Sequence, residues 1–442
     1  MSMIRDLGDG LILRRATQAD TEELVAFDAA VQSDGGMDSP DELVGAWVRD
    51  LMSDGHPTIR PGDFTVVVDT RSGQIVSSLN LISQTWTYDG VPFGAGQPEL
   101  VATHPDYRRR GLVRAQFEVV HRWSAERGEL VQGVTGIPNY YRQFGYEMAL
   151  ELDGGRMGYG VHVPRLKEGE AEPFHVRRAA EADVSFLGQV YDAGCRRGPI
   201  ACVRDEALWR YEIHGKSEKN VNGRVLCVIE TPGGEPVGFL AHPGRLWGQG
   251  IYAQAYELMP GVSWLAVTPS VVRSLWSDGE AYAARDGVKD LQAFGLWLGK
   301  EHPVYHVFGD RLPRTRDPYA WYLRVPDLAG FLRRIAPALE RRLAQSWLPG
   351  HSGELTLSFY RDGLKLSFEG GRLVGVERWV PGHAETGDAA FPDLTFLQLL
   401  FGYRSLDELE QSFADCWASG DKARPLLEAL FPRQPSNLWW VT

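Results

Sequence analysis

A cluster of basic residues precedes a predicted amphipathic helix near residue 110. Arg108, Arg109 and Arg110 are followed by Gly111, and an apolar strand over residues 100–103 comes before them. The apolar face of the helix consists of Leu112, Ala115, Val119, Val120 and Trp123. An anion site is expected here, because the start of a helix has free N–H groups and the side chains before it are positive. The glycine also lets the backbone approach a phosphate closely. This strand, turn and helix predict binding of a pyrophosphate.

The same stretch resembles a known cofactor motif. Residues 108–113 read Arg-Arg-Arg-Gly-Leu-Val, which is similar to the Arg/Gln-x-x-Gly-x-Gly/Ala motif of the GNAT acetyltransferases. Val113 replaces a small residue there, at a position that supplies a backbone N–H. The resemblance implies an acetyl-CoA site, with the strand beside the pantetheine arm. The cofactor-binding residues that it implies are Val101, Ala102, Thr103, Arg108, Arg109, Arg110, Gly111, Leu112, Val113 and Arg114.

A tyrosine-rich segment follows at residues 136–146, GIPNYYRQFGY. GNAT enzymes often carry a tyrosine four residues before a Gly-aromatic pair, and Tyr141 has this spacing here. By resemblance, its hydroxyl protonates the leaving CoA thiolate. A phenol suits this role because its pKa of about 10 keeps it protonated at neutral pH, while a developing thiolate can still take the proton. Tyr140 is the alternative.

An internal repeat organises the first three quarters of the chain. The octapeptides that end at Asp20 and Asp183, LRRATQAD and VRRAAEAD, each predict a strand, a turn and a helix with an acid at its start. Two β-hairpins, at 66–76 and 227–237, continue the match. Two matches in nearly the same register indicate a duplicated domain, with a linker over 160–173.

The section after residue 324 shares no pattern with the repeat. Here the sequence predicts a helix over 327–347, an antiparallel meander over 355–379, and helices at 394–403, 405–418 and 421–430. We therefore expect an α+β (mixed α/β) fold with three domains, at residues 1–160, 174–324 and 325–442.

This layout resembles the Eis (enhanced intracellular survival) acetyltransferases, whose tail is similar to a sterol carrier protein. The resemblance implies tandem GNAT folds, a catalytic one followed by a degenerate one, and a sterol-carrier-like C-terminal domain. It also implies direct transfer of acetyl to an amine, such as an aminoglycoside, a polyamine or a lysine of a protein. Assembly into a hexamer is a further implication.

Two groups are candidates for the catalytic base. In the Eis family the C-terminal carboxylate of the chain enters the active site, which by resemblance assigns this role to Thr442. The aromatic residues that tend to end those chains lie upstream here, at Trp439 and Trp440. Glu99 is the alternative, because many GNAT enzymes use a glutamate near this strand. Either carboxylate would take a proton from the ammonium form of the acceptor.

The second repeat is expected to lack the cofactor turn. Its counterpart of the cofactor stretch is expected at residues 265–285, as a strand ending near Pro269 and a following helix. The Arg-x-x-Gly turn is then missing, because its place is taken by Val272, Arg273, Ser274 and Leu275, which include no glycine. The hypothesis is a structural copy that shapes the substrate cavity.

Composition excludes several other classes of function. A net charge of −12 disfavours non-specific binding to nucleic acid or to anionic membranes. The four cysteines form no Cys-x-x-Cys pair and have no histidine at metal-ligand spacing, so we expect neither a disulfide framework nor a metal site. The polar N-terminus and the lack of a long apolar run predict a cytoplasmic protein without membrane spans.

One rival interpretation belongs to a different class. The chain could be a lipid-binding or small-ligand-binding protein that uses its C-terminal section and keeps a vestigial GNAT fold. The apolar residues that alternate along 355–379 would then line a groove. They would pack equally well against the helices of the same section.

Overall fold

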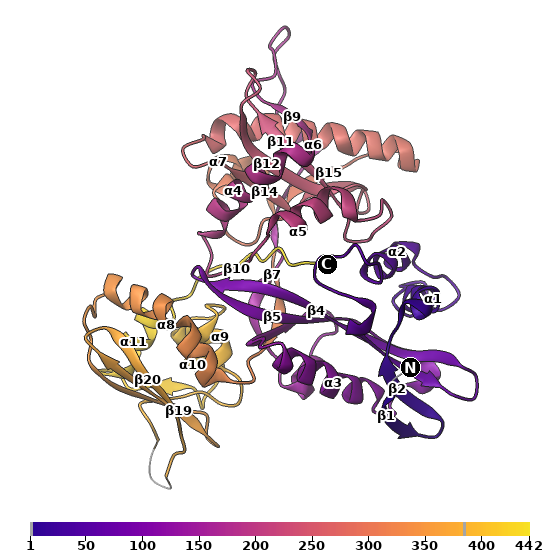
Figure 1. Cartoon of the computed structure of the whole chain (residues 1–442). Coiled ribbons are helices and arrows are strands. Elements are labelled where there is room, and N and C mark those ends of the chain that lie inside the picture. Colours follow the sequence, from indigo (N-terminus) through magenta and orange to yellow (C-terminus); the bar gives the residue numbers. More distant parts are fainter. Residues whose placement is uncertain (1–2, 383–385) are drawn as a thin grey trace.

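The computed structural model describes residues 3–382 and 386–442. Figure 1 shows three sections, with the indigo and purple N-terminal section in contact with both of the others. Within the described residues, none of the helices combines the length and the apolar character that crossing a bilayer requires.

The N-terminal section is one twisted sheet with helices on both faces. Its own strands are β1 (Met3–Gly8), β2 (Leu11–Arg15), β3 (Phe64–Asp69), β4 (Gln74–Tyr88), β5 (Val91–Thr103), β6 (Val131–Val134) and β7 (Glu147–Leu152). Alternation along β3 separates two cores: Val66 and Val68 pack with helices α1 (Thr21–Val31) and α2 (Glu42–Leu51), whereas Val67 packs with α3 (Leu112–Glu126).

Strands β5 and β6 run parallel but soon separate. They pair only at Ala95 with Val131 and at Gly96 with Gln132, and β5 then continues to Thr103. A bulge lies in this free stretch, where Leu100 has a φ of 51°. The β5 edge beyond Gly96 therefore has backbone groups that β6 does not pair.

The second section has a strand order related to that of the first. Strands β9 (His175–Arg178), β11 (Arg224–Glu230), β12 (Pro236–Pro243) and β14 (Ala255–Leu258) are connected in the order β9-β11-β12-β14, which matches β2-β3-β4-β5. A short strand, β13 (Gly250–Ala253), runs parallel to β15 (Ala293–Leu296). The helices are α4 (Val184–Cys195), α5 (Glu206–Arg210), α6 (Trp264–Asp286) and α7 (Val304–Phe308).

The two octapeptides have the same local structure. Asp20 is the N-cap of α1 and Asp183 is the N-cap of α4. Each carboxylate receives two hydrogen bonds from an arginine six residues earlier, Arg14 at 2.8 and 2.7 Å and Arg177 at 2.7 and 2.8 Å. The expected acid at the start of each helix is confirmed.

The two repeats exchange strands, so their sheets do not end at the predicted boundaries. Strand β17 (Tyr319–Arg324) lies between β6 and β7 in the first sheet. Reciprocally, β8 (Gly155–Tyr159) lies between β15 and β16 (Arg314–Arg316) of the second section. In addition, β10 (Ile200–Cys202) pairs with the far end of β4.

One element of the second repeat differs from the expectation. Residues 265–268, expected as a strand, are the start of α6, and Pro269 lies inside this helix. Ser263 caps the helix by accepting a hydrogen bond from the N–H of Ala266, which sets its start before the apolar residues. The strand that corresponds to β5 is therefore β14, and residues 259–263 form the turn.

The C-terminal section is an α+β unit whose elements follow the predicted pattern with one exception. The helix expected over 405–418 ends at Ser412, because Phe413 is extended, and residues 417–418 form a short strand. Helix α8 (Leu328–Gln345) begins at its cap Asp327 and covers an antiparallel meander of β18 (Gly353–Ser358), β19 (Gly363–Glu369) and β20 (Arg372–Trp379). The remaining elements are β21 (Ala389–Ala390), α9 (Phe396–Leu400), α10 (Leu406–Ser412), β22 (Trp417–Ala418) and α11 (Ala423–Leu430).

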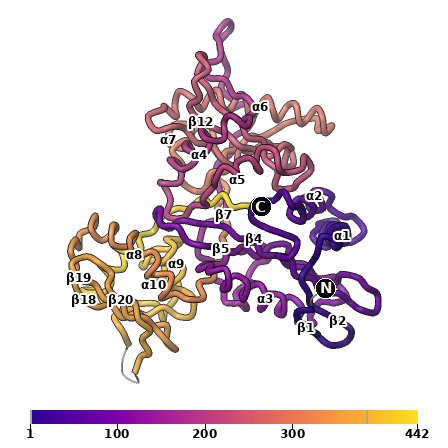
Figure 2. Tube along the Cα trace, in the orientation of Figure 1, coloured from indigo at the N-terminus to yellow at the C-terminus, as the bar shows by residue number. Residues whose placement is uncertain are grey.

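The last residues leave this section and return to the first two. In Figure 2 the yellow end of the chain runs to a point beside α2 and below α5. Here Trp439 packs against Trp209 with ring centroids 5.6 Å apart, and the N–H of Val441 donates to Gln84 of β4. We call residues 435–442 the C-terminal segment.

Candidate functional site

The basic turn begins α3 in the geometry that an anion site needs. Gly111 is the N-cap, with a left-handed φ of 77°, and Arg109 is also left-handed with a φ of 62°. Arg110 contacts Asp9 at 3.4 Å, whereas Arg109 has no ion-pair partner in the described part of the chain. A cationic side chain and the first N–H groups of α3 are therefore available to an anion.

A cavity of about 700 Å³ surrounds this turn. Nine of the ten predicted cofactor-binding residues line it, namely Val101, Thr103, Arg108, Arg109, Arg110, Gly111, Leu112, Val113 and Arg114. The exception is Ala102, which is buried in the core under α1 and α2. Neighbouring residues of a strand point to opposite faces, which explains why Ala102 differs from Val101 and Thr103.

The cavity has the donors that acetyl-CoA requires. Pyrophosphate would meet the start of α3 and the arginines of the turn. The free edge of β5 could pair with the amides of the pantetheine arm, as an added strand would. The Nε2 of Gln32 already lies 3.4 Å from the carbonyl oxygen of Val101 on this edge.

Tyr141 lies at the start of a short helical turn (Tyr141–Phe144) and is surrounded by aromatic rings. The ring centroids of Tyr140, Phe117 and Tyr146 are 5.3, 6.1 and 6.4 Å from that of Tyr141. Tyr322 of β17 completes the cluster at 5.5 Å. Tyr140 itself lines the cavity, whereas Tyr141 contacts the Tyr140 ring but is not among the lining residues.

Two titratable groups of the site have displaced pKa values. Burial raises the pKa of Tyr141 above its ordinary value, and the nearby Glu99 carboxylate adds to this effect. Burial also raises the pKa of Glu99 to about 7, against the hydrogen bond from Gln97. The phenol therefore keeps its proton at neutral pH, while the carboxyl group can exchange one there.

Thr442 lies at the junction of the first two sections, and its side chain is buried. Its hydroxyl accepts a hydrogen bond of 2.9 Å from Nζ of Lys216, whose pKa burial lowers to about 8. Thr442 is not among the residues that line the cofactor cavity, and neither are Tyr141 and Glu99. The role of Thr442 as the base remains a prediction.

Several buried polar atoms near Glu99 have no hydrogen-bond partner among the residues that the structure describes. Asn80 stands opposite Glu99 in the β4–β5 pair, and both of its side-chain polar atoms are unpaired. Asp28 of α1 accepts a hydrogen bond of 2.6 Å from Ser78 through Oδ1, while its Oδ2 is unpaired. Unpaired buried groups are costly, so they mark a place where a polar ligand can bind. Sequence reasoning missed Asn80, because a lone asparagine in a strand has no distinguishing pattern.

A group of potential metal ligands lies in the second section. Ligand atoms of Cys227, His242 and Asp278 are within 4.8 Å of one another. The Arg178 guanidinium is 3.4 Å from the Cys227 sulfur, 3.3 Å from Nε2 of His242 and 3.4 Å from Oδ1 of Asp278. A cationic side chain thus already holds the position that a metal ion would take.

The turn of the second repeat has a different composition. Residues 259–263, between β14 and α6, read Met-Pro-Gly-Val-Ser and contain no arginine. Its counterpart in the first section runs from His104 to Gly111 and carries three arginines. The anion site is therefore present in the first repeat only, within these two turns.

Comparison with known proteins agrees with this geometry. A family model described as an acetyltransferase (GNAT) domain matches residues 13–149. This part of the chain therefore matches a GNAT acetyltransferase domain, and the match ends within β7. No curated protein sequence matches the chain at a significant level.

Solved structures share the fold over nearly the whole length. A probable N-acyltransferase from Enterococcus faecalis is similar at a TM-score of 0.65 and 15% identity, covering 96% of this chain and 97% of that one. A GCN5-related N-acetyltransferase from Kribbella flavida has a TM-score of 0.62 at 16% identity, covering 97% of both chains. Eis1 from Mycobacterium abscessus has a TM-score of 0.59 at 13% identity, covering 96% and 98%.

Proposed function

We propose that this protein is an acyltransferase that moves acetyl from acetyl-CoA to an amine. The observation that carries the proposal is a single cavity in which the arginine turn and the free edge of β5 meet Tyr140, the member of the tyrosine cluster that lines it. A vestigial domain would have no reason to keep the left-handed Gly111 and an unpaired Arg109. The turn at 259–263 of the second repeat, which has lost the arginines, illustrates the contrast.

The reaction can be written with the residues of this chain. Glu99 takes a proton from the acceptor ammonium, and the free amine attacks the thioester carbonyl carbon. A C–N bond forms as the C–S bond breaks, and Tyr141 donates its proton to the leaving sulfur. The second proton of the former ammonium returns to the phenolate, and Glu99 releases its proton to solvent. The products are an amide, free CoA and one proton.

We assign the base to Glu99 because it lies close enough to Tyr141 to raise the pKa of that phenol. Its own pKa of about 7 makes it half ionised at neutral pH. The terminal carboxylate of Thr442 is the second candidate, in keeping with the Eis resemblance. It would act from the junction that Lys216 and His56 border.

The acceptor side is proposed to hold a cationic amine. Asn80 of β4, whose side chain is unpaired among the described residues, stands opposite Glu99 of β5. Asp28 of α1 is bonded to Ser78, two residues before Asn80, and its second carboxylate oxygen is unpaired. The indole N–H of Trp47 in α2 is buried and unpaired as well. Aminoglycosides, polyamines and protein lysines all fit this chemistry. A homo-hexamer and a sterol-carrier-like tail are parts of the same proposal and follow from the resemblance to Eis.

The first test is release of free CoA in the presence of acetyl-CoA and a panel of amines from these three classes. Amine-dependent release is expected, and calorimetric titration should give one acetyl-CoA bound per chain. Two acetyl-CoA molecules bound per chain would mean that the second repeat also binds the cofactor and is not only a structural copy. Failure of acetyl-CoA to bind at all would contradict the proposal.

A second function has one observation in its favour. The C-terminal section contains a cavity of about 1200 Å³ between the start of α8, the β18–β19 turn and α9. A lipid or small ligand would bind there under the rival interpretation. However, most of the alternating apolar residues of the meander are buried in the core against the helices, namely Leu355, Leu357, Leu366, Phe368 and Val376. Binding of a fluorescent fatty acid that leaves CoA release unchanged would establish this site separately.

A further inference from the structure

A chain of hydrogen bonds links the C-terminal segment to Glu99. The N–H of Val441 donates to Oε1 of Gln84 at 3.2 Å. Nε2 of Gln84 donates to Oε1 of Gln97, and Nε2 of Gln97 donates to Oε1 of Glu99 at 2.6 Å. Both glutamines are buried, so water does not compete for these bonds.

Groups that can only donate decide which atom donates and which accepts in each of these hydrogen bonds. Oε1 of Gln84 accepts from the Val441 backbone N–H and from the indole N–H of Trp86, at 3.2 and 3.0 Å. Neither donor can act as an acceptor, so the NH₂ group of Gln84 must face Gln97. That in turn directs the carbonyl of Gln97 towards Gln84 and its NH₂ group towards Glu99.

The consequence for Glu99 is that its two oxygens are not equivalent. Oε1 faces an N–H donor and can only accept there, which favours the ionised carboxylate. A proton taken from the acceptor amine is therefore favoured on Oε2, while the backbone N–H of Leu100 also bonds the Glu99 carboxylate. The side chain is also held in one orientation, as proton transfer at a defined atom requires.

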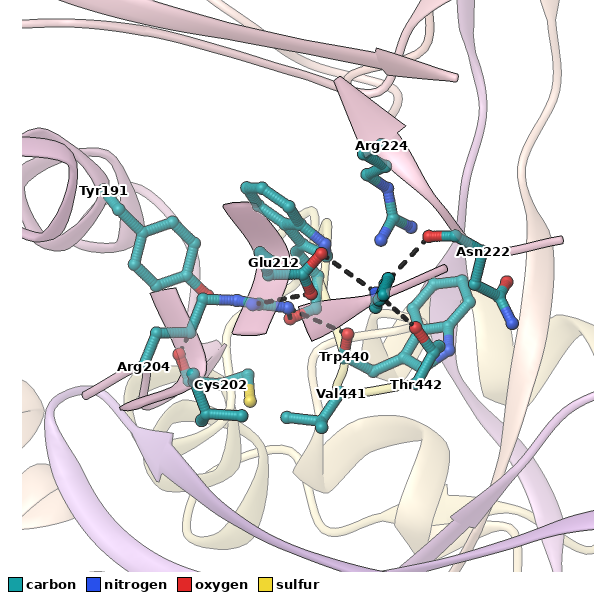
Figure 3. Close-up of polar contacts among 12 residues, drawn as sticks. Tyr191, Cys202, Arg204, Glu212, Asn222, Arg224, Trp440, Val441 and Thr442 are labelled. Atoms are coloured by element: carbon teal, nitrogen blue, oxygen red, sulfur yellow. Dashed lines mark hydrogen bonds and ion pairs between the residues drawn. The ribbon is translucent and has the colours of Figure 1, made fainter. Parts of the chain in front are cut away.

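The second section holds in place the Val441 N–H, which is the donor at the start of this series of hydrogen bonds. Arg204 donates to the carbonyl oxygens of Trp439 and Trp440 at 3.2 and 2.9 Å, and it pairs with the buried Glu212 at 3.1 Å. Figure 3 shows the Arg204 side chain between Glu212 and the C-terminal segment. Val441 follows directly, so Arg204 fixes the stretch of chain that carries its N–H.

We propose that Gln84 and Gln97 are positioning residues that fix the protonation site of Glu99, with their polarity set by the C-terminal segment that the second section holds. The repeat without a cofactor turn would thereby contribute to catalysis in the first. This inference rests on the proposed function, in which Glu99 accepts the proton.

The test is the pH dependence of kcat/KM for the amine in Gln97→Leu. Without the donor, the pKa of Glu99 rises, so the rising limb of the profile moves to higher pH by about one unit. Activity falls about tenfold below the limb and recovers at high pH, which general damage to the fold would not produce. The KM for acetyl-CoA stays unchanged.

Two further variants test the serial arrangement. Gln84→Leu should move the limb in the same direction but less, because Gln97 can then rotate its amide. The double variant should equal Gln97→Leu alone, since both changes break one chain. Gln398→Leu, which removes a buried glutamine of α9, is the matched control and should leave the limb in place.

The outcomes separate this inference from the proposed function. A limb that stays in place in Gln97→Leu, but disappears in Glu99→Gln, overturns the positioning role and leaves Glu99 as the base. A limb that persists in Glu99→Gln shows that the base is another group, and the proposed mechanism fails first. Additive shifts in the double variant would also contradict a single chain.

Discussion

The ring of Tyr322 packs edge-on against Tyr141, with centroids 5.5 Å apart and planes at 64°. Tyr322 belongs to β17, the last strand of the second section, and its hydroxyl accepts a hydrogen bond of 2.6 Å from the N–H of Asn139. The proposed acid of the first section is thus positioned by a strand that the second section supplies. This contact orients the residue on which the first prediction rests.

Tyr141→Phe should lower turnover by about 100- to 10,000-fold, because it removes a general acid. The affinity for acetyl-CoA should hardly change, since the phenol acts on the leaving sulfur and the ring is kept. The measurement is single-turnover CoA release together with calorimetric binding. Tyr140→Phe is the matched control, because its ring neighbours Tyr141 and lines the cavity. A larger loss in Tyr140→Phe would reverse the assignment.

The pH profile should report Glu99. Its pKa of about 7 means that kcat/KM for the amine rises as pH increases towards 7 and levels off above it, because only the carboxylate accepts a proton. Glu99→Gln should remove this limb and lower the rate by about 100- to 10,000-fold. Any limb left in the variant should follow the pKa of the acceptor amine and move when the amine is changed.

The role of Gly111 can be separated from its contribution to stability. Gly111→Ala places a side chain at a φ of 77°, with nothing within 4 Å of the added carbon, so the cost is backbone strain of about 1 kcal/mol. Gly128→Ala creates the same strain beyond the other end of α3, at a φ of 71° and also without a neighbour. Both should lower the melting temperature similarly. Only Gly111→Ala should weaken acetyl-CoA binding, and equal affinities would contradict the proposed anion site.

The duplicated arginine–aspartate pairs should differ in their effect on stability. The Arg14 and Asp20 side chains are 6% and 7% exposed, whereas Arg177 is 42% exposed. Asp20→Asn should therefore destabilise the fold by about 3–5 kcal/mol, and Asp183→Asn by about 1 kcal/mol. The arginines hold the pKa of both aspartates below its ordinary value. Their stabilisation is present above about pH 4 and is lost as pH falls through the folded pKa, which acid denaturation would measure.

The carboxylate of Thr442 can be tested without disturbing its packing. In a chain that ends at Thr442, conversion of the terminal carboxylate to a carboxamide removes the charge but keeps the size of the group. If turnover then falls by about 100-fold or more, this carboxylate is the base. Unchanged turnover would leave the role to Glu99. An added tag is a weaker test, because Thr442 is 1% exposed and extra residues would disturb the junction as well.

The sequence predicted the parts of the site that depend on neighbouring residues. The turn at Arg108–Gly111 and the helix after it are local, and nine of the ten expected residues line one cavity. Ala102 differs because strand alternation turns it into the core. The helix at 265–268 was mistaken for a strand because its apolar residues precede a proline, whereas the Ser263 cap decides the structure.

The long-range parts of the site could not be predicted in this way. The position of Tyr322 depends on insertion of β17 between β6 and β7, and neither neighbour indicates that a strand from residue 319 onwards will separate them. The link from Val441 to Glu99 joins residues of the chain end to β4 and β5 through two ordinary glutamines. Periodicity describes which face of an element is apolar, but it does not describe which distant segment covers that face.

The reciprocal exchange of β8 and β17 has a consequence for biosynthesis. While the chain emerges from the ribosome, the first sheet stays one strand short until residue 324 is available, although the arginine turn and Tyr141 have long been translated. The nascent first domain therefore presents the edges of β6 and β7 without their partner, which is the kind of edge that chaperones protect from aggregation. A prematurely terminated product would carry the arginine turn without the complete sheet, so the proposed acetyl transfer and complete translation are coupled by topology.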